Sequence, residues 1–322
     1  REKNSLGQYE GGPVYYLKKG LNFKSLAFFY AIMGLFVSLG MGNLVQSNAM
    51  ATAVNKSFNI PRIIPGIIAA VLIFIIMSGG VKRIMSLTVV IIPFLSIFYM
   101  LFSIIIILHY INRLPEVLLE ILINAFDFKA IAGGGFGSAV RYGFSRGIFS
   151  NEAGLGTSSV SHCTSYVKDP AKQGLWGIIE VFIDTIVLCS FTAVVVLITG
   201  SEHSSKNGVN IAINAYKSVL GISGEYFLTI SLILFAFSTI LAWSFYGQSY
   251  FKYIFGVKRQ WFYKFLFSLF IITGSVFGSD LVWKICDVFN GFVIIPNLLG
   301  LLFLSNHVIK ATKDFKRRNR LN

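Results

Sequence analysis

The stretch from Phe149 to Gly156 carries most of the chemistry in this sequence. It reads Phe-Ser-Asn-Glu-Ala-Gly-Leu-Gly, and places a carboxylate, an amide and two glycines in sequence otherwise apolar enough for a bilayer. Such backbone is tolerated at membrane depth only where it lines a cavity or is buried in protein. A helix broken here would present carbonyls and N–H groups of opposite partial charge, able to hold a cation beside an anion. An ordinary helix-turn-helix at the membrane edge is the alternative.

Ionisable residues flank this stretch inside apolar sequence. Glu180 and Asp184 are four residues apart and therefore share a helix face. Charged groups within a membrane span need a partner. Arg141 and Arg146 are the obvious candidates, so we expect one of them to pair with Asp184. The pair would be structural or, alternatively, would serve gating or coupling.

Small and polar residues also recur at helical spacing. Gly34, Ser38, Gly42 and Gln46 are spaced by four, so they form a stripe that another helix can approach closely. This places the Gln46 amide against protein, where a packing hydrogen bond is its simplest role. The adjacent hydroxyls of Ser238 and Thr239 either bond to carbonyls of their own helix or supply oxygen ligands to a small cation.

Composition defines the class of protein that must position these groups. The 322 residues are 55% hydrophobic and 13% charged, with a mean hydropathy of +0.69. These values indicate an all-α polytopic membrane protein. Eight spans are predicted, within a single transmembrane domain over residues 1–322: about 26–50, 63–79, 84–111, 136–167 (broken), 173–199, 225–253, 260–278 and 281–309. Residues 115–128 and 210–220 are expected to lie at the membrane surface.

The net charge of +14 reflects basic residues in the loops between apolar runs, so nucleic acid is not an expected partner. If the N-terminal segment is cytoplasmic, 19 basic residues fall on the cytoplasmic side and 7 outside. The positive-inside rule then places both termini of this chain in the cytoplasm of a plasma-membrane protein.

Enzyme and metal motifs receive no support from this layout. Gly143-Phe-Ser-Arg-Gly147 matches the G-x-S-x-G pattern, but a nucleophile elbow needs a strand before it and the predicted context is helical. The three cysteines and four histidines are scattered, without metal-ligand or disulfide spacing. We expect no enzymatic activity and no organic cofactor.

The signatures taken together resemble the alanine or glycine:cation symporter family. The resemblance rests on these segments in order: Gly11-Gly-Pro-Val-Tyr-Tyr16, Gly42-Asn-Leu-Val-Gln-Ser-Asn48, Arg141-Tyr-Gly143, Phe149 to Gly156, Phe182-Ile-Asp-Thr185 and Ser238 to Trp243. It implies the leucine-transporter-like fold of five plus five helices in inverted repeat, with core helices three to ten present here.

The resemblance also implies roles for particular residues. Gln46 and Trp243 would line the substrate cavity, Phe149 would cover it, and the backbone from Ile148 to Asn151 would contribute polar groups. Ser238 and Thr239 would be sodium ligands of an incomplete site.

The implied function is secondary transport of a small neutral amino acid, alanine or glycine, into the cell with sodium as the coupling ion. The family's first helices have no counterpart before Arg1. The alternative is therefore a transport-inactive truncated or split-gene fragment, with a separately encoded N-terminal segment as its partner.

Overall fold

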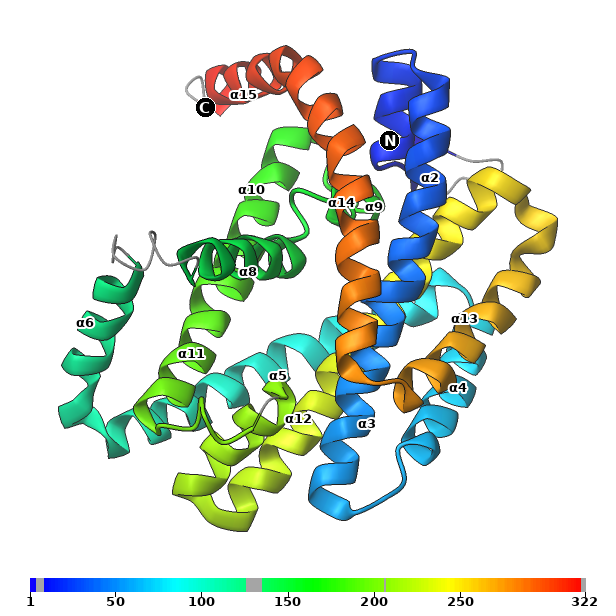
Figure 1. Cartoon of the computed structure of the whole chain (residues 1–322). Helices are drawn as coiled ribbons and strands as arrows, with labels where there is room; N and C mark the ends of the chain where they lie inside the picture. The colour runs from blue at the N-terminus through cyan, green and yellow to red at the C-terminus, as the bar shows by residue number, and fades with distance from the viewer. Residues whose placement is uncertain (4–8, 126–134, 206, 320–322) are drawn as a thin grey trace.

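The computed structural model describes residues 1–3, 9–125, 135–205 and 207–319 and is built almost entirely of helices (Figure 1). A short antiparallel hairpin opens the chain, pairing β1 (Glu2–Lys3) with β2 (Tyr9–Glu10). Gly12 takes a φ of 104°, and Pro13 then starts the helical turns α1 (Pro13–Tyr15) and η1 (Tyr16–Gly20).

The first membrane segment continues through three elements without a loop. They are α2 (Lys24–Leu39), the π-helix η2 (Gly40–Leu44) and α3 (Val45–Phe58). Asn59 ends α3 in the left-handed conformation, which asparagine adopts more readily than most residues.

The middle of the chain holds the helices that precede and form the predicted broken span. They are α4 (Ile63–Ser78), α5 (Val81–His109), η3 (Ile111–Arg113), α6 (Leu114–Ala125), α8 (Gly135–Asn151) and α9 (Ser158–His162). The surface helix expected over 115–128 corresponds to α6, and its last three residues lie outside the described part.

The remaining helices complete the fold. They are α10 (Pro170–Val181), the π-helix η4 (Phe182–Leu188), α11 (Cys189–Ile198), α12 (Gly208–Phe255), η5 (Val257–Arg259), α13 (Gln260–Val276), α14 (Ser279–Phe303) and α15 (Ser305–Asn319). Gly221, with φ 63° and ψ −146°, kinks α12 and separates the predicted surface piece from the predicted span.

The chain is a polytopic membrane protein. Within the described residues, five helical segments are long and apolar enough to cross a bilayer: Lys24–Phe58, Ile92–His109, Pro170–Ile198, Gly208–Phe255 and Ser279–Phe303. The spans expected at 63–79 and 260–278 form helices of 16 and 17 residues. The span expected over 281–309 is too long, because α14 ends at Phe303 and α15 turns away from it (Figure 1).

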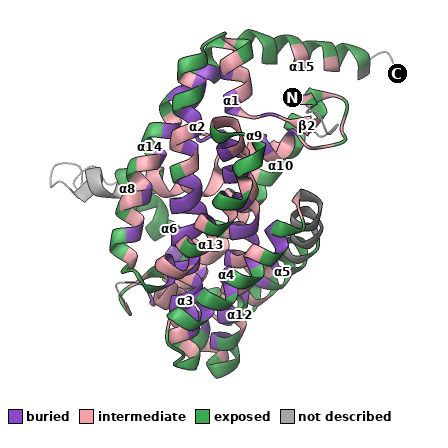
Figure 2. Cartoon of the chain, turned by 90° about the vertical axis from the view of Figure 1, so that its right-hand side faces the viewer, coloured by how far each residue is buried: buried purple, intermediate pink, exposed green. Residues whose placement is uncertain are grey.

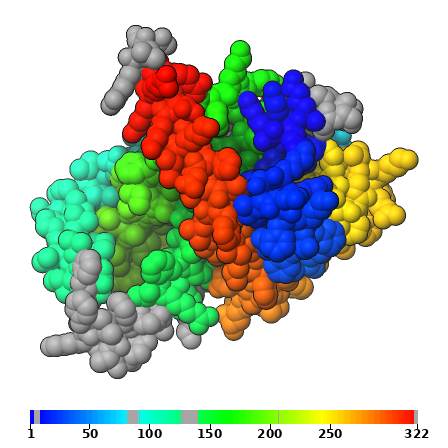
Figure 3. Space-filling model, turned by 90° about the horizontal axis from the view of Figure 1, so that it is seen from above, coloured from blue at the N-terminus to red at the C-terminus, as the bar shows by residue number. Residues whose placement is uncertain are grey.

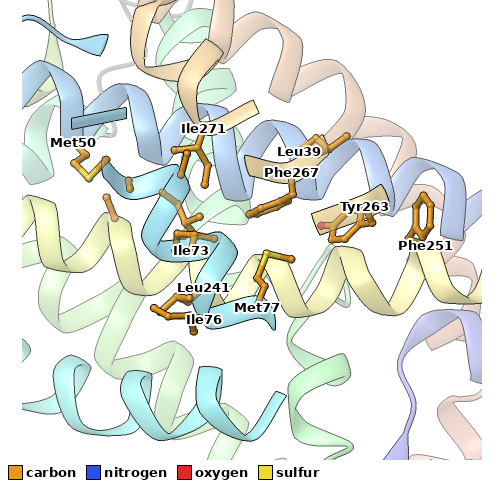
Figure 4. Close-up of a cluster of buried hydrophobic side chains, with 14 residues drawn as sticks. Leu39, Met50, Ile73, Ile76, Met77, Leu241, Phe251, Tyr263, Phe267 and Ile271 are labelled. Carbon is orange, nitrogen blue, oxygen red and sulfur yellow. The ribbon is translucent and has the colours of Figure 1, made fainter. Parts of the chain in front are cut away.

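Packing concentrates around α12. It contacts α2, α3, α5 and α13, and α13 in turn packs on α4. One buried cluster joins α3, α4, α12 and α13 through side chains such as Met50, Ile73, Leu241 and Phe267 (Figure 4). Buried residues follow α2 through the middle of the molecule, whereas α15 is exposed along most of its length (Figure 2). Seen from above, α14 lies beside the N-terminal helices (Figure 3).

The predicted stripe of small residues meets α12. A Cβ atom at Gly34 would lie 2.8 Å from the Tyr250 ring, and one at Gly247 would lie 2.2 Å from the Ser38 hydroxyl. A Cβ at Gly42 would lie 2.1 Å from Cγ of Trp243. The first three positions of the stripe therefore do what their spacing predicts, which is to let two helices approach closely.

Candidate functional site

The predicted break is present between α8 and α9. Glu152, directly after α8, has a φ of 53°, and Gly156 has a φ of 78°. A positive φ is unfavourable for glutamate, so the surrounding structure must hold it in place. The side-chain oxygen of Asn151 accepts a hydrogen bond from the N–H of Ala153 at 3.0 Å, which closes a local turn. Leu155 is buried, so the break lies against protein.

Side chains from two other elements bind the carbonyls of the break, and a third supports one of them. The Tyr30 hydroxyl on α2 donates to the Leu155 carbonyl at 2.7 Å. The Asn297 amide on α14 donates to the Gly154 carbonyl at 2.9 Å and to the Ala153 carbonyl at 3.3 Å. Tyr16 on η1 donates to the side-chain oxygen of Asn297. Backbone groups freed by the break are thereby satisfied inside the protein.

The Tyr16 hydroxyl is protonated at physiological pH and can therefore donate to Asn297, and burial raises its pKa further above the ordinary value.

Trp243 connects α12 to the break. Its indole N–H donates to Oε1 of Glu152 at 3.0 Å, while the Thr157 hydroxyl donates to Oε2 at 2.7 Å. Trp243 is only 1% exposed and lies on Gly42 in the π-helix η2. A glycine is required there because any side chain would occupy the position of the indole. Trp243, which was predicted to be a site residue, therefore contacts the predicted break through Glu152.

The other predicted cavity residues lie nearby. Gln46 is half-buried on α3, directly after η2. Ile148 and Phe149, on the last turn of α8, pack against the buried cluster that contains Trp243. The Phe149 ring also packs on Trp283 of α14, with 4.9 Å between ring centroids.

Ser238 lies on α12, just over one turn before Trp243, and is 1% exposed. Its hydroxyl donates to the carbonyl of Phe235 at 2.9 Å. This is the first of the two alternatives given by the sequence, a hydrogen bond to a carbonyl of its own helix. Thr239 is half-buried. Within the described residues, no group of three or more His, Cys, Asp or Glu side chains could hold a metal ion.

The predicted charge pair is not formed, and this expectation is corrected. Arg146 makes a bidentate ion pair with Asp287 of α14, with both contacts at 3.0 Å, and stacks on Trp283 at 4.0 Å. Asp184 instead accepts a hydrogen bond from Ser150 at 2.5 Å. Arg146 therefore pairs with a carboxylate of α14, while Asp184 on η4 is bound by a hydroxyl of α8.

The remaining two charges also lie apart from this pair. Glu180 contacts Nε2 of His162 at 2.9 Å. Arg141 is exposed and makes no ion pair with a described residue.

Sequence reasoning overlooked three contributors to the site: Glu152, Asp287 and Asn297. Asp287 was identifiable, because an ionisable residue inside a predicted span is a functional candidate by default. Glu152 was recognised only as part of its motif. Asn297, which is fully buried, follows Pro296 in α14, and nothing in its local sequence shows that it would bind the break.

A broken helix held by side chains from several apolar spans is an arrangement found in membrane transporters. A model of the sodium:alanine symporter family matches residues 1–322, and the chain belongs to this family. The family comprises transporters, so this protein is not an enzyme.

The chain is similar to characterised and uncharacterised transporters. It is 37% identical to an uncharacterised transporter of Haemophilus influenzae, covering 100% of this chain and 72% of that protein. It is 36% identical to the sodium/alanine symporter AgcS of Methanococcus maripaludis, covering 98% and 71% respectively. It is also 34% identical to a probable sodium/glutamine symporter, GlnT, of Bacillus subtilis, covering 97% and 66%. These relatives give no support to the alternative of an inactive fragment.

Proposed function

We propose that the protein moves a small neutral amino acid, alanine or glycine, into the cell together with sodium. The observation that carries this proposal is the break at residues 152–157. Its carbonyls are bound by Tyr30 and Asn297, and its carboxylate is bound by Trp243. The family and the relative AgcS support sodium and alanine as the transported pair.

Several finer features belong to the same proposal. The spans would form the five-plus-five inverted repeat, with both termini of this chain in the cytoplasm. Gln46, Phe149, Trp243 and the backbone from Ile148 to Asn151 would contact the amino acid. Ser238 and Thr239 would turn their hydroxyls toward sodium. An inward sodium gradient would drive uptake, because bound sodium completes the conformation that binds the amino acid.

Uptake by the purified protein in proteoliposomes tests the proposal. With an inward sodium gradient, radiolabelled alanine or glycine should accumulate, and replacing sodium by potassium should abolish accumulation. Gln46→Ala and Trp243→Ala should reduce uptake while membrane insertion is retained. Ser238→Ala with Thr239→Ala should raise the sodium concentration needed for half-maximal uptake. Accumulation that is indifferent to sodium, or preference for glutamine, would contradict the proposal.

A further inference from the structure

A hollow of about 340 Å³ lies at the turn between α12 and α13, far along the chain from the break. Its lining comes from the last turns of α12, from η5 and from the first turn of α13: Phe251, Phe255, Lys258, Arg259, Trp261 and Phe262. The turn is at the upper right of Figure 1, in yellow and gold. It lies at the same end of the molecule as the chain's N-terminus and α15.

The hollow combines two free cations with an aromatic wall. Neither Lys258 nor Arg259 makes an ion pair with a described residue, in contrast to Lys252 near the end of α12, which pairs with Glu10. The aromatic side chains are open to the surroundings: Trp261 is 66% exposed and Phe262 is 54% exposed. Aromatic rings and basic side chains in this combination are typical of the level of lipid headgroups.

An apolar stripe continues from the hollow along α13. Trp261, Phe265 and Leu269 are spaced by four, so they share one face of the helix. All three are at least 45% exposed, and the rings of Trp261 and Phe265 stack with 6.1 Å between centroids. The cations at one end and the exposed stripe below them match the two parts of an amphiphile, a negative headgroup and an acyl chain.

We propose that this hollow is a binding site for an anionic phospholipid. Lys258 and Arg259 bind the phosphate of the headgroup, and one acyl chain follows the stripe formed by Trp261, Phe265 and Leu269. Basic pockets between membrane helices are known to recognise anionic headgroups. The stripe favours a phospholipid over free phosphate, because a free anion makes no use of the apolar face.

Thermal unfolding of the purified protein in detergent tests this site without any transport measurement. Phosphatidylglycerol should raise the unfolding midpoint more than phosphatidylcholine at the same mole fraction. The double substitution Lys258→Gln with Arg259→Gln should lose most of this difference. The matched control, Lys310→Gln with Lys313→Gln, neutralises two exposed cations on α15 and should keep it.

A second measurement keeps the test decisive if the double variant folds poorly. Brominated phosphatidylglycerol should quench tryptophan fluorescence of the wild type more than that of Trp261→Phe. In the thermal measurement, an equal rise of the unfolding midpoint with phosphatidylcholine would overturn the proposal. So would a loss of the lipid difference in the α15 control as large as that in the double variant. A rise reproduced by inorganic phosphate alone would show a plain anion site and would also overturn it.

Discussion

Two parts of the molecule pack very differently around the break. The scaffold, comprising α2 to α4, α12 and α13, has dense helix contacts, while the arm, comprising α8 and α10 to α11, has few. Of the most apolar stretch in Lys24–Phe58, 56% is buried, compared with 11% in Pro170–Ile198. Glycines show the same contrast: Gly42 and Gly247 are in tight contact with side chains, whereas a Cβ at Gly143 or Gly147 would meet nothing within 4 Å.

The difference indicates where stability and movement reside. The scaffold is fixed by interdigitated side chains, so displacing any one of them is costly. The arm is held by fewer contacts: Arg146 on α8 pairs with Asp287 of α14, and the last turns of α11 pack on α5 and α12 around Val195. Ser150 and Asp184 join α8 to η4 within the arm. Segments with few buried contacts open most easily, and alternating access needs one part that moves against another. The break joins the arm to α12 through Glu152 and to α14 through Asn297.

The largest effect is expected where the break is held. Asn297→Ala removes a fully buried amide and leaves the carbonyls of Ala153 and Gly154 without their donor. Each buried group left unpaired costs about 1–3 kcal/mol, so the loss of unfolding free energy should exceed that of any other single change described here. Denaturant or thermal unfolding in detergent measures it. The exposed Asn306→Ala on α15 is the control, and equal stability of the two variants would refute the role of Asn297.

A matched pair of glycines tests the packing contrast directly. Gly247→Ala places a methyl group 1.9 Å from the Tyr263 hydroxyl, and overpacking of this kind costs about 1–3 kcal/mol. Gly147→Ala in the arm meets no neighbour and gains up to about 1 kcal/mol of helix propensity. Unfolding midpoints should therefore shift in opposite directions. Similar destabilisation of both variants would show that the arm is packed as tightly as the scaffold.

The ion pair on the arm should contribute less. Arg146 and Asp287 are each 34% exposed, and hydrogen bonds to charged groups contribute about 1.5–3 kcal/mol when protected from water. We therefore expect Arg146→Gln to cost about 1–2 kcal/mol, reduced by solvent screening. Adding Asp287→Asn should restore part of the loss, because the unpaired carboxylate is removed. A double variant as destabilised as the sum of its singles would exclude coupling between them.

The smallest effect is expected for Asp280→Asn. Asp280 pairs with Lys284, one helical turn later on α14, and both side chains are more than 70% exposed. Exposed pairs at this spacing contribute little, because water and salt screen the two charges. If Asp280→Asn lowered the unfolding free energy as much as Arg146→Gln does, solvent exposure would not explain the difference expected between these two ion pairs.

Features set by local sequence were predictable. The break was expected from glycines and a carboxylate in apolar surroundings. A close approach of some other helix was expected from the spacing of Gly34, Ser38 and Gly42, and the structure identifies that helix as α12. Both inferences need only the periodicity of one helix or the cost of polar backbone in lipid.

Features set by distant partners were not predictable. Arg146 had two acidic candidates nearby in sequence, yet it pairs with Asp287, 141 residues away. Likewise, the amide of Asn297 reaches Gly154 over a separation of 143 residues. Spacing restricts which residues share a face of one helix, but the choice among possible partners depends on how the helices pack in three dimensions.

Sodium-driven alanine uptake by Gly42→Ala tests the central claim most directly, namely that Trp243 must lie on η2 and bind Glu152 for transport. The added methyl would lie 2.1 Å from Cγ of Trp243 and must displace the indole. We predict sodium-dependent uptake by the wild type and at least about a tenfold loss in Gly42→Ala, which corresponds to about 1.4 kcal/mol. Gly143→Ala should transport like the wild type. Undiminished uptake by Gly42→Ala, in a protein that inserts normally, would contradict the claim.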